Sequence, residues 1–143
     1  PEGLATIAMF RAAQIEYDKG DKEKAYSILQ SIHDDSGIDD LYRDYALITM
    51  SLKKSEDENA DYKAAAEALE DLAEDDNPWQ ASALEVRAVL YTKAGEINAA
   101  KQSLVALLEN EKSTLVRHER AKKFLHVLSE QYGDEVAVEP AAE

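Results

Sequence analysis

Apolar side chains recur at helical spacing along most of the chain. In the segment 22–35 they fall at positions i, i+3, i+4 and i+7, and two later segments carry similar stripes. The three stripes are Ala25, Ile28, Leu29 and Ile32; Ala65, Ala68, Leu69 and Leu72; and Ala100, Leu104, Leu107 and Leu108. This spacing indicates amphipathic α-helices. Alternation of apolar and polar residues is never long enough to predict a β-strand.

Glycine and proline mark the ends of these helices. Gly20, Gly37, Gly95 and Gly133 each follow a helical segment, where a residue with positive φ often ends a helix. The run Asn77-Pro78-Trp79-Gln80 predicts a helix start, with Asn77 as the cap and Gln80 reaching back to it. The chain is predicted to form seven helices, over 4–19, 22–35, 39–54, 61–75, 78–94, 97–110 and 114–132. The acidic segment 134–143 is predicted to be a disordered tail.

Small residues inside the helices recur at a regular interval. The intervals between Ala13, Ala46, Ala88 and Ala121 are 33, 42 and 33 residues. Ala25 lies 12 residues after Ala13, and Ala100 lies 12 residues after Ala88. Removing a seven-residue insertion near 53–59 from the long interval leaves a period of 33–35 residues. Two antiparallel helices pass within about 8–10 Å, where a methyl group permits contact and a larger side chain does not. The pattern predicts helix–turn–helix repeats.

The repeat resembles the tetratricopeptide repeat (TPR). Ala88, Tyr91, Gly95, Ala100 and Leu104 match that family's small, aromatic, turn-glycine, small and large positions, and the first repeat matches with Ala13, Gly20, Ala25 and Leu29. The first repeat has Glu16 at the aromatic position, and the second has no turn glycine. The resemblance implies an all-α, right-handed superhelix of about seven helices over residues 1–133, with residues 114–132 as a terminal cap.

A narrower resemblance rests on the order of features along the chain. Alanine-rich helix pairs come first, followed by Asn77-Pro78-Trp79, Leu84-Glu85, Lys93-Ala94-Gly95-Glu96 and Arg117-His118-Glu119-Arg120-Ala121. This order is similar to the soluble part of bacterial membrane-anchored TPR-like proteins related to YfgM, an ancillary subunit of the Sec translocon. That family implies a periplasmic position at the inner membrane, an anchor upstream of Pro1, and translocon subunits or periplasmic chaperones as partners. The residues themselves leave a cytoplasmic location open.

TPR arrays bind polypeptides on a concave face formed mainly by the first helix of each repeat. Placing this sequence on that geometry predicts eleven protein-binding candidates: Phe10, Gln14, Tyr17, Arg43, Leu47, Met50, Glu85, Val89, Thr92, His118 and Lys122. Aromatic side chains would supply contact area, and Arg43 or Lys122 could receive a carboxylate. The alternative is that several of these residues pack between helices. The lysine and asparagine clamp of TPRs that bind chaperone tails is not recognisable.

Composition narrows the classes of function. Acidic residues outnumber basic ones 30 to 16, so a formal charge of −14 disfavours binding to nucleic acid or anionic lipid. The chain contains no cysteine, which excludes disulfides and thiolate chemistry. No apolar run approaches the roughly 20 residues of a membrane-spanning helix.

No catalytic, cofactor or metal motif is recognisable. Asp57, Asn59 and Asp61 imitate the first ligands of a calcium loop, but Tyr62 and Ala68 stand where such a loop needs glycine and glutamate. We interpret this segment as a solvated acidic insertion. The basic residues Lys112, Arg117, Arg120, Lys122 and Lys123 could complement a helix dipole or dock an acidic partner.

These observations together predict a non-catalytic scaffold or adaptor that binds other proteins, with no cofactor. The alternative is a self-assembly module, because the terminal helices of such arrays can pair.

Overall fold

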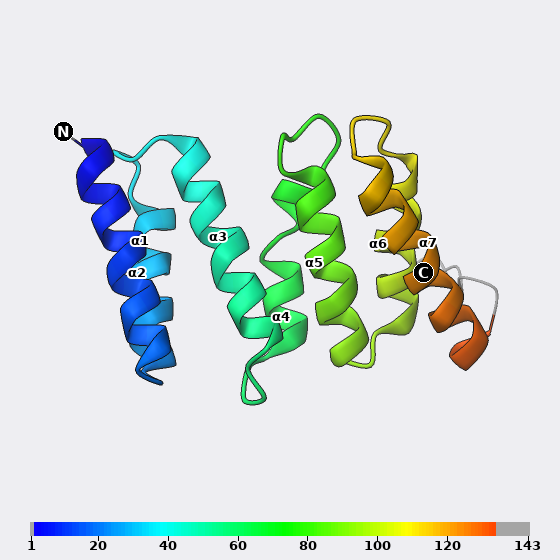
Figure 1. Cartoon of the computed structure of the whole chain (residues 1–143). Helices are drawn as coiled ribbons and strands as arrows, with labels where there is room; N and C mark the ends of the chain where they lie inside the picture. Colours follow the sequence, from blue (N-terminus) through cyan, green and yellow to red (C-terminus); the bar gives the residue numbers. More distant parts are fainter. Residues whose placement is uncertain (1, 134–143) are drawn as a thin grey trace, which may run out of the picture. The chain divides into compact units, whose positions relative to one another are not determined.

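The computed structural model describes residues 2–133, and the predicted tail 134–143 lies outside them. The described residues form seven α-helices and one 3₁₀ helix, with no β-strand among them (Figure 1). The elements are α1 (Glu2–Asp18), α2 (Lys22–Asp34), α3 (Asp40–Ser55), α4 (Tyr62–Glu67), η1 (Asp71–Ala73), α5 (Gln80–Lys93), α6 (Ile97–Glu109) and α7 (Leu115–Tyr132). The predicted all-α fold and its helix order are confirmed.

The fourth helix is shorter than predicted. Instead of covering 61–75, α4 ends at Glu67, and a turn and η1 follow it. Leu69 and Leu72 are buried as the stripe predicted, whereas Ala68 is exposed. Acidic residues follow at Glu70, Asp71, Glu74, Asp75 and Asp76, and negative charge near a helix C-terminus opposes the helix dipole. The tighter 3₁₀ turn still brings Leu72 into the core.

Two predicted end signals act differently from expectation. Gly37 does not have positive φ, unlike Gly20, Gly95 and Gly133; its N–H instead donates to the Asp35 carboxylate at 2.8 Å. Helix α5 begins at Gln80 and not at Pro78, because the Asn77 side chain accepts from Trp79 N–H at 2.8 Å and closes a turn there. The Gln80 amide does not cap this turn at Asn77 but hydrogen-bonds to Ala73, Asp75 and Asn110.

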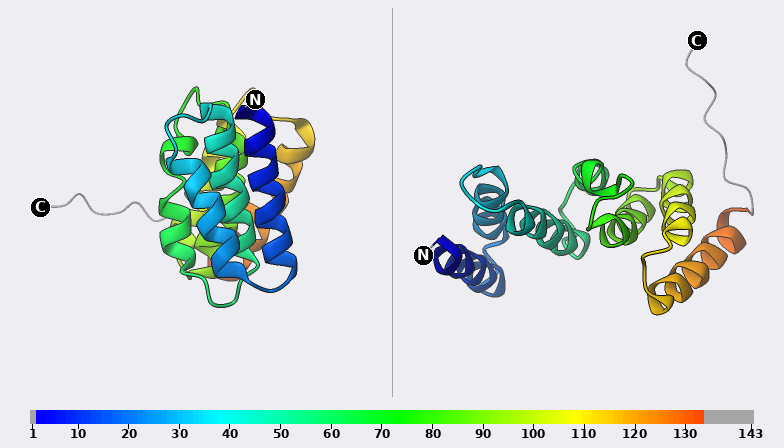
Figure 2. Two further views of the ribbon diagram at one scale, coloured as in Figure 1. Left: turned by 90° about the vertical axis from the view of Figure 1, so that its left-hand side faces the viewer. Right: turned by 90° about the horizontal axis from the view of Figure 1, so that it is seen from above.

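The chain divides into two compact units. Unit 1 is Pro1–Asp57 and contains α1, α2 and α3; unit 2 is Glu58–Glu143 and contains the remaining helices. Within each unit, the helices that pack most closely are neighbours in sequence, as the views in Figure 2 show. In unit 2, α5 packs against α4 and η1 as well as α6.

Helices α5–α7 repeat the arrangement of α1–α3, with each equivalent residue 75 positions later in the sequence. The buried alanines Ala13, Ala25 and Ala46 recur as Ala88, Ala100 and Ala121, and all six are at most 2% exposed. The prediction that these methyl groups are buried inside the packed helices is confirmed. Loop contacts recur with the same spacing: Asp35 and Asn110 each accept from the N–H two residues ahead.

A buried polar side chain fixes the end of the third helix in both copies of this arrangement. In unit 1 the Tyr26 hydroxyl donates to the Asp57 carboxylate at 3.0 Å, and Lys22 Nζ lies 3.6 Å from the other oxygen. Burial, followed by the hydrogen bond and charge of Asp57, raises the pKa of Tyr26. In unit 2 the counterpart of Tyr26 is Lys101, whose ammonium donates to the Gly133 carbonyl. Asp57 is 5% exposed, so our interpretation of it as part of a solvated insertion was wrong.

Replacing Ala13 by leucine is expected to lower the free energy of unfolding by about 1–3 kcal/mol, because a larger side chain forces α1 away from α2. Ala5→Leu, at an exposed position of the same helix, is the control and should change stability by less than about 0.5 kcal/mol. Urea denaturation followed by circular dichroism measures both. Equal stability of the two variants would show that α1 does not pack at Ala13.

Replacing Tyr26 by phenylalanine is expected to cost about 1–3 kcal/mol, because the buried Asp57 carboxylate loses a hydrogen bond. Tyr132→Phe serves as the control, since Tyr132 is 59% exposed. Thermal unfolding should separate the two variants by a lower Tm for Tyr26→Phe alone. An unchanged Tm would mean that this hydrogen bond does not hold the end of α3.

Candidate protein-binding face

An aromatic pair joins α1 and α3 on one face of unit 1. The rings of Phe10 and Tyr45 have centroids 5.2 Å apart and are tilted by 55°. Tyr45 remains 46% exposed, and Phe10 is half-buried. Tilted aromatic pairs at this distance are favourable and rigid, so the two rings present a fixed apolar surface.

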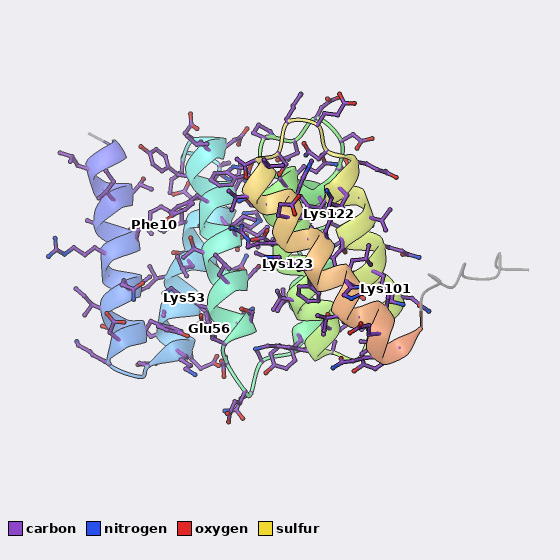
Figure 3. The ribbon with its side chains drawn as sticks, turned by 45° about the vertical axis from the view of Figure 1, so that its right-hand side comes forward. Phe10, Lys53, Glu56, Lys101, Lys122 and Lys123 are labelled. Atoms are coloured by element: carbon purple, nitrogen blue, oxygen red, sulfur yellow. The ribbon has the colours of Figure 1, made fainter. Side chains whose placement is uncertain are left out.

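A lysine lies on the same face, further along both helices. Lys53 Nζ donates to the Gln14 side-chain oxygen at 2.7 Å and lies 4.1 Å from the centroid of the Tyr17 ring. Phe10 and Lys53 lie between the ribbons of α1 and α3 (Figure 3). We call Phe10, Gln14, Tyr17, Tyr45 and Lys53 the aromatic face.

The charge of Lys53 is not neutralised by an acid of the described residues. Its ammonium contacts an amide oxygen and a π-system, and no carboxylate there is ion-paired with it. An ammonium with a remaining donor can receive a carboxylate from another molecule. The aromatic face therefore combines apolar area with one positive charge, on a chain that is acidic overall.

Of the residues predicted for unit 1, Phe10, Gln14 and Tyr17 of α1 lie on this face, whereas those of α3 lie elsewhere. Leu47 and Met50 are 5% and 4% exposed and offer a partner little surface. Arg43 donates through Nε to the His33 carbonyl at 2.8 Å and pairs with Asp40 at 3.1 Å, so it caps the end of α2. Tyr45 and Lys53 occupy the face in their place. The repeat spacing correctly predicted that Ala46 is buried, but it did not predict which side of α3 faces α1.

The predicted residues of unit 2 lie on the corresponding helices but form a different surface. Glu85, the counterpart of Phe10, accepts from Arg120 at 2.9 and 3.1 Å, and its Oε2 lies 3.5 Å from Arg117 Nε. Arg120 is the counterpart of Tyr45, so an ion pair replaces the aromatic pair. Thr92 donates back to the Ala88 carbonyl at 2.7 Å, and Val89 is half-buried.

The two remaining candidates on α7 differ in their roles. His118 is the counterpart of Arg43, and its Nε2 contacts the Asn110 carbonyl at 2.8 Å, so it also caps the preceding helix. Lys122 is exposed and pairs with Glu119 at 3.3 Å. Figure 3 shows Lys122 and Lys123 on α7. With Arg117 and Arg120 bound to Glu85, much of the basic cluster predicted from the sequence is compensated locally.

Unit 2 also contains a polar cleft of about 720 Å³ that the sequence did not indicate. It lies between the turn before α5 and the loop from α6 to α7, where Asp75, Asp76, Glu109, Glu111 and Arg117 are among its lining residues. Lys112 at its edge is 3.8 Å from Asp76. The cleft carries both charges, and its lining residues include no aromatic side chain.

One family model matches the chain, the tetratricopeptide repeat, over residues 7–36. This segment covers most of α1, all of α2 and the turn between them, which is one helix–turn–helix repeat. The chain has a TPR-like fold. The match supports a role in binding proteins, since TPRs generally mediate protein–protein interaction. No curated protein and no solved structure matches the chain.

Residues 82–111, which lie 75 positions after the matched segment, form the equivalent helix pair of unit 2. Within the described residues, no cluster of three or more acidic or histidine side chains is arranged to hold a metal ion. None of the helices described has the length and hydropathy that crossing a bilayer requires.

Asp44, near the start of α3, gives stability a pH dependence. Burial raises the pKa of its carboxyl, and neighbouring Asp40 raises it further. Ionising the Asp44 carboxyl therefore costs more free energy in the native state than in the unfolded state. This cost lowers the stability of the fold above the raised pKa. It disappears as the pH falls below the ordinary pKa value of 3.8.

Asp44→Asn is thus expected to raise Tm at neutral pH, with the gain shrinking in acid, where Asp44 is protonated in both states. Thermal unfolding of both proteins across a pH series measures the difference. A gain that is the same at every pH, or a loss at neutral pH, would contradict this assignment.

Proposed function

We propose that the chain is a non-catalytic scaffold that binds other polypeptides through the aromatic face of unit 1. The observation that carries this proposal is the partly exposed Phe10–Tyr45 pair, together with the Lys53 ammonium further along the same face, which has no carboxylate of the described residues as an ion-pair partner. The TPR match covers the part of α1 that contributes three of the five residues, and it supports protein binding as the general role.

The chemistry of the face indicates the kind of segment it binds. Two fixed rings offer area to an aromatic or branched apolar side chain, and Lys53 offers a charge-assisted hydrogen bond to a carboxylate. A segment with an apolar anchor and an acidic residue, or a chain terminus, would satisfy both. Nucleic acid is disfavoured by the net charge of −14.

The equivalent face of unit 2 supports assigning recognition to unit 1. There the ion pair of Glu85 with Arg120 satisfies both charged groups internally, and a partner would have to displace it. The exposed ion pair offers a partner little apolar area, whereas the aromatic pair provides such area and needs no rearrangement before contact.

We propose the periplasmic side of a bacterial inner membrane as the setting, in protein secretion or envelope-protein quality control. Translocon subunits and periplasmic chaperones would then be the partners. The support is the order of motifs from Asn77 to Ala121 and its similarity to YfgM-related proteins.

Affinity capture from native bacterial membranes tests the proposal, with Phe10→Ala and Lys53→Glu compared against the unchanged chain. Each variant is expected to weaken capture of specific partners by roughly tenfold, since truncating an interface anchor typically costs more than about 1 kcal/mol. Lys123→Glu, an exposed charge reversal on α7, is the matched control and should capture the same proteins as the parent.

Circular dichroism of each variant confirms that the helices are intact. Capture of an identical set of proteins by all variants would show that the aromatic face is not the binding surface. Partners that are absent from the inner membrane and periplasm would contradict the setting but leave the face assignment intact.

A further inference from the structure

Helix α1 has a second apolar face, which is exposed to solvent. Leu4, Ile7 and Ile15 on this face are 65%, 53% and 45% exposed. With Ala8 and Arg11 they lie three or four positions apart, so they form one stripe along the helix. We call these five residues the outer stripe.

The equivalent face of α5 in unit 2 is buried. The counterparts of Ala8, Arg11 and Ile15 on α5 are Ala83, Val86 and Leu90. These three residues of α5 are 0%, 6% and 0% exposed. Both α1 and α5 pack against the helix that follows them, but α5 also packs against α4 and η1, which precede it. Among the described residues no element comes before α1, and we attribute the difference in exposure to the contacts of α4 and η1.

The elements that precede α5 show the chemistry that suits this kind of face. The segment of α4 and η1 buries two small residues and then two leucines, each at most 5% exposed: Ala65, Ala66, Leu69 and Leu72. The small residues permit close approach of the two helices, and the leucines supply apolar area. The side chains between them are acidic and exposed at Glu67, Glu70 and Asp71. The segment is therefore amphipathic, with carboxylates beside its buried stripe.

Charge on the outer stripe fits a segment of the same chemistry. Arg11 is exposed on the stripe where α5 has Val86, and none of the ion pairs formed within the described part of the chain involves it. An acidic amphipathic helix would bring carboxylates to the Arg11 guanidinium, while the aliphatic stem of Arg11 packs beside its neighbours. The outer stripe itself contains no acidic residue that would repel such a helix.

We propose that the outer stripe is the packing surface for an acidic amphipathic helix of the α4–η1 type, supplied by residues that precede Pro1 in the full-length polypeptide. This helix covers α1 as α4 and η1 cover α5. Arg11, within the stripe, is one position from Phe10 and so about 100° around the helix from it. The proposal therefore concerns a different side of α1 from the aromatic face and does not depend on the proposed function.

Cysteine accessibility tests the proposal, because the chain has no cysteine of its own. Ile15→Cys is introduced into the chain 1–143 and into the purified full-length gene product, since the counterpart Leu90 is fully buried. Maleimide labelling of this cysteine is expected to be slower in the full-length product by roughly tenfold or more, because labelling then requires the covering helix to open. The unsubstituted full-length product gives the background.

Leu115→Cys is the matched control for labelling. Leu115 lies at the start of α7 and is 75% exposed, so this cysteine should react at the same rate in both proteins. A general effect of the longer chain on reactivity would slow both cysteines, whereas the covering helix slows only the one on the outer stripe.

A charge substitution gives a second and independent readout. Ile15→Glu should leave the Tm of the chain 1–143 nearly unchanged, because the position is exposed there. In the full-length product the same substitution is expected to lower Tm by several degrees, because it places a carboxylate in an apolar contact. Leu115→Glu should change neither protein.

Equal labelling rates of Ile15→Cys in the two proteins would overturn the proposal. Protection that appears only in unfractionated membranes would assign the stripe to another protein, and protection that grows with the concentration of the chain 1–143 would assign it to a second copy. Either result would overturn the assignment to a preceding helix of the same polypeptide.

Discussion

The fold depends on close approach of neighbouring helices at buried methyl groups. Ala13, Ala25 and Ala46, and their counterparts in unit 2, are buried where a larger side chain would separate the helices. Once these contacts set the distance between helices, leucines such as Leu29 and Leu104 fill the grooves beside them. The same contacts also determine which side chains remain outside, including those of the aromatic face.

Polar side chains hold the ends of the helices that pack at these methyl groups. Tyr26 and Lys101 occupy equivalent positions, and each binds a group just past the end of the third helix of its set. Arg43 and His118 also occupy equivalent positions. Arg43 binds a carbonyl at the end of α2, and His118 binds one at the end of α6. The chemical groups differ while the role is the same, which shows that the geometry of the three-helix set, and not one residue type, requires a polar contact there.

The fold was largely predictable from the sequence, whereas the site was predictable only in part. Helical stripes and spaced alanines depend on local periodicity, which one chain displays directly. The end of α3 is held by residues far apart in the sequence, since Asp57 accepts a hydrogen bond from Tyr26, 31 residues earlier. Contacts of this kind leave no local signal in the sequence. Leu47 and Met50, which were predicted on the binding face, are buried, and Tyr45 and Lys53 of the aromatic face were not among the predicted residues. The shortened α4 has a different origin. The acidic residues that follow Glu67 are a local signal, but the apolar spacing alone predicted a longer helix.

The preference for packing between sequence neighbours also bears on how the protein is made. Within each unit, the closest helix pairs, such as α1 with α2 and α5 with α6, are joined by short turns. Low sequence separation between contacting residues favours rapid folding. During synthesis, each helix can dock onto its predecessor soon after it leaves the ribosome, before the remaining chain exists. Docking in this order shortens the time for which the apolar residues that become buried are exposed to solvent, whereas Leu4, Ile7 and Ile15 of α1 stay exposed after their unit has folded.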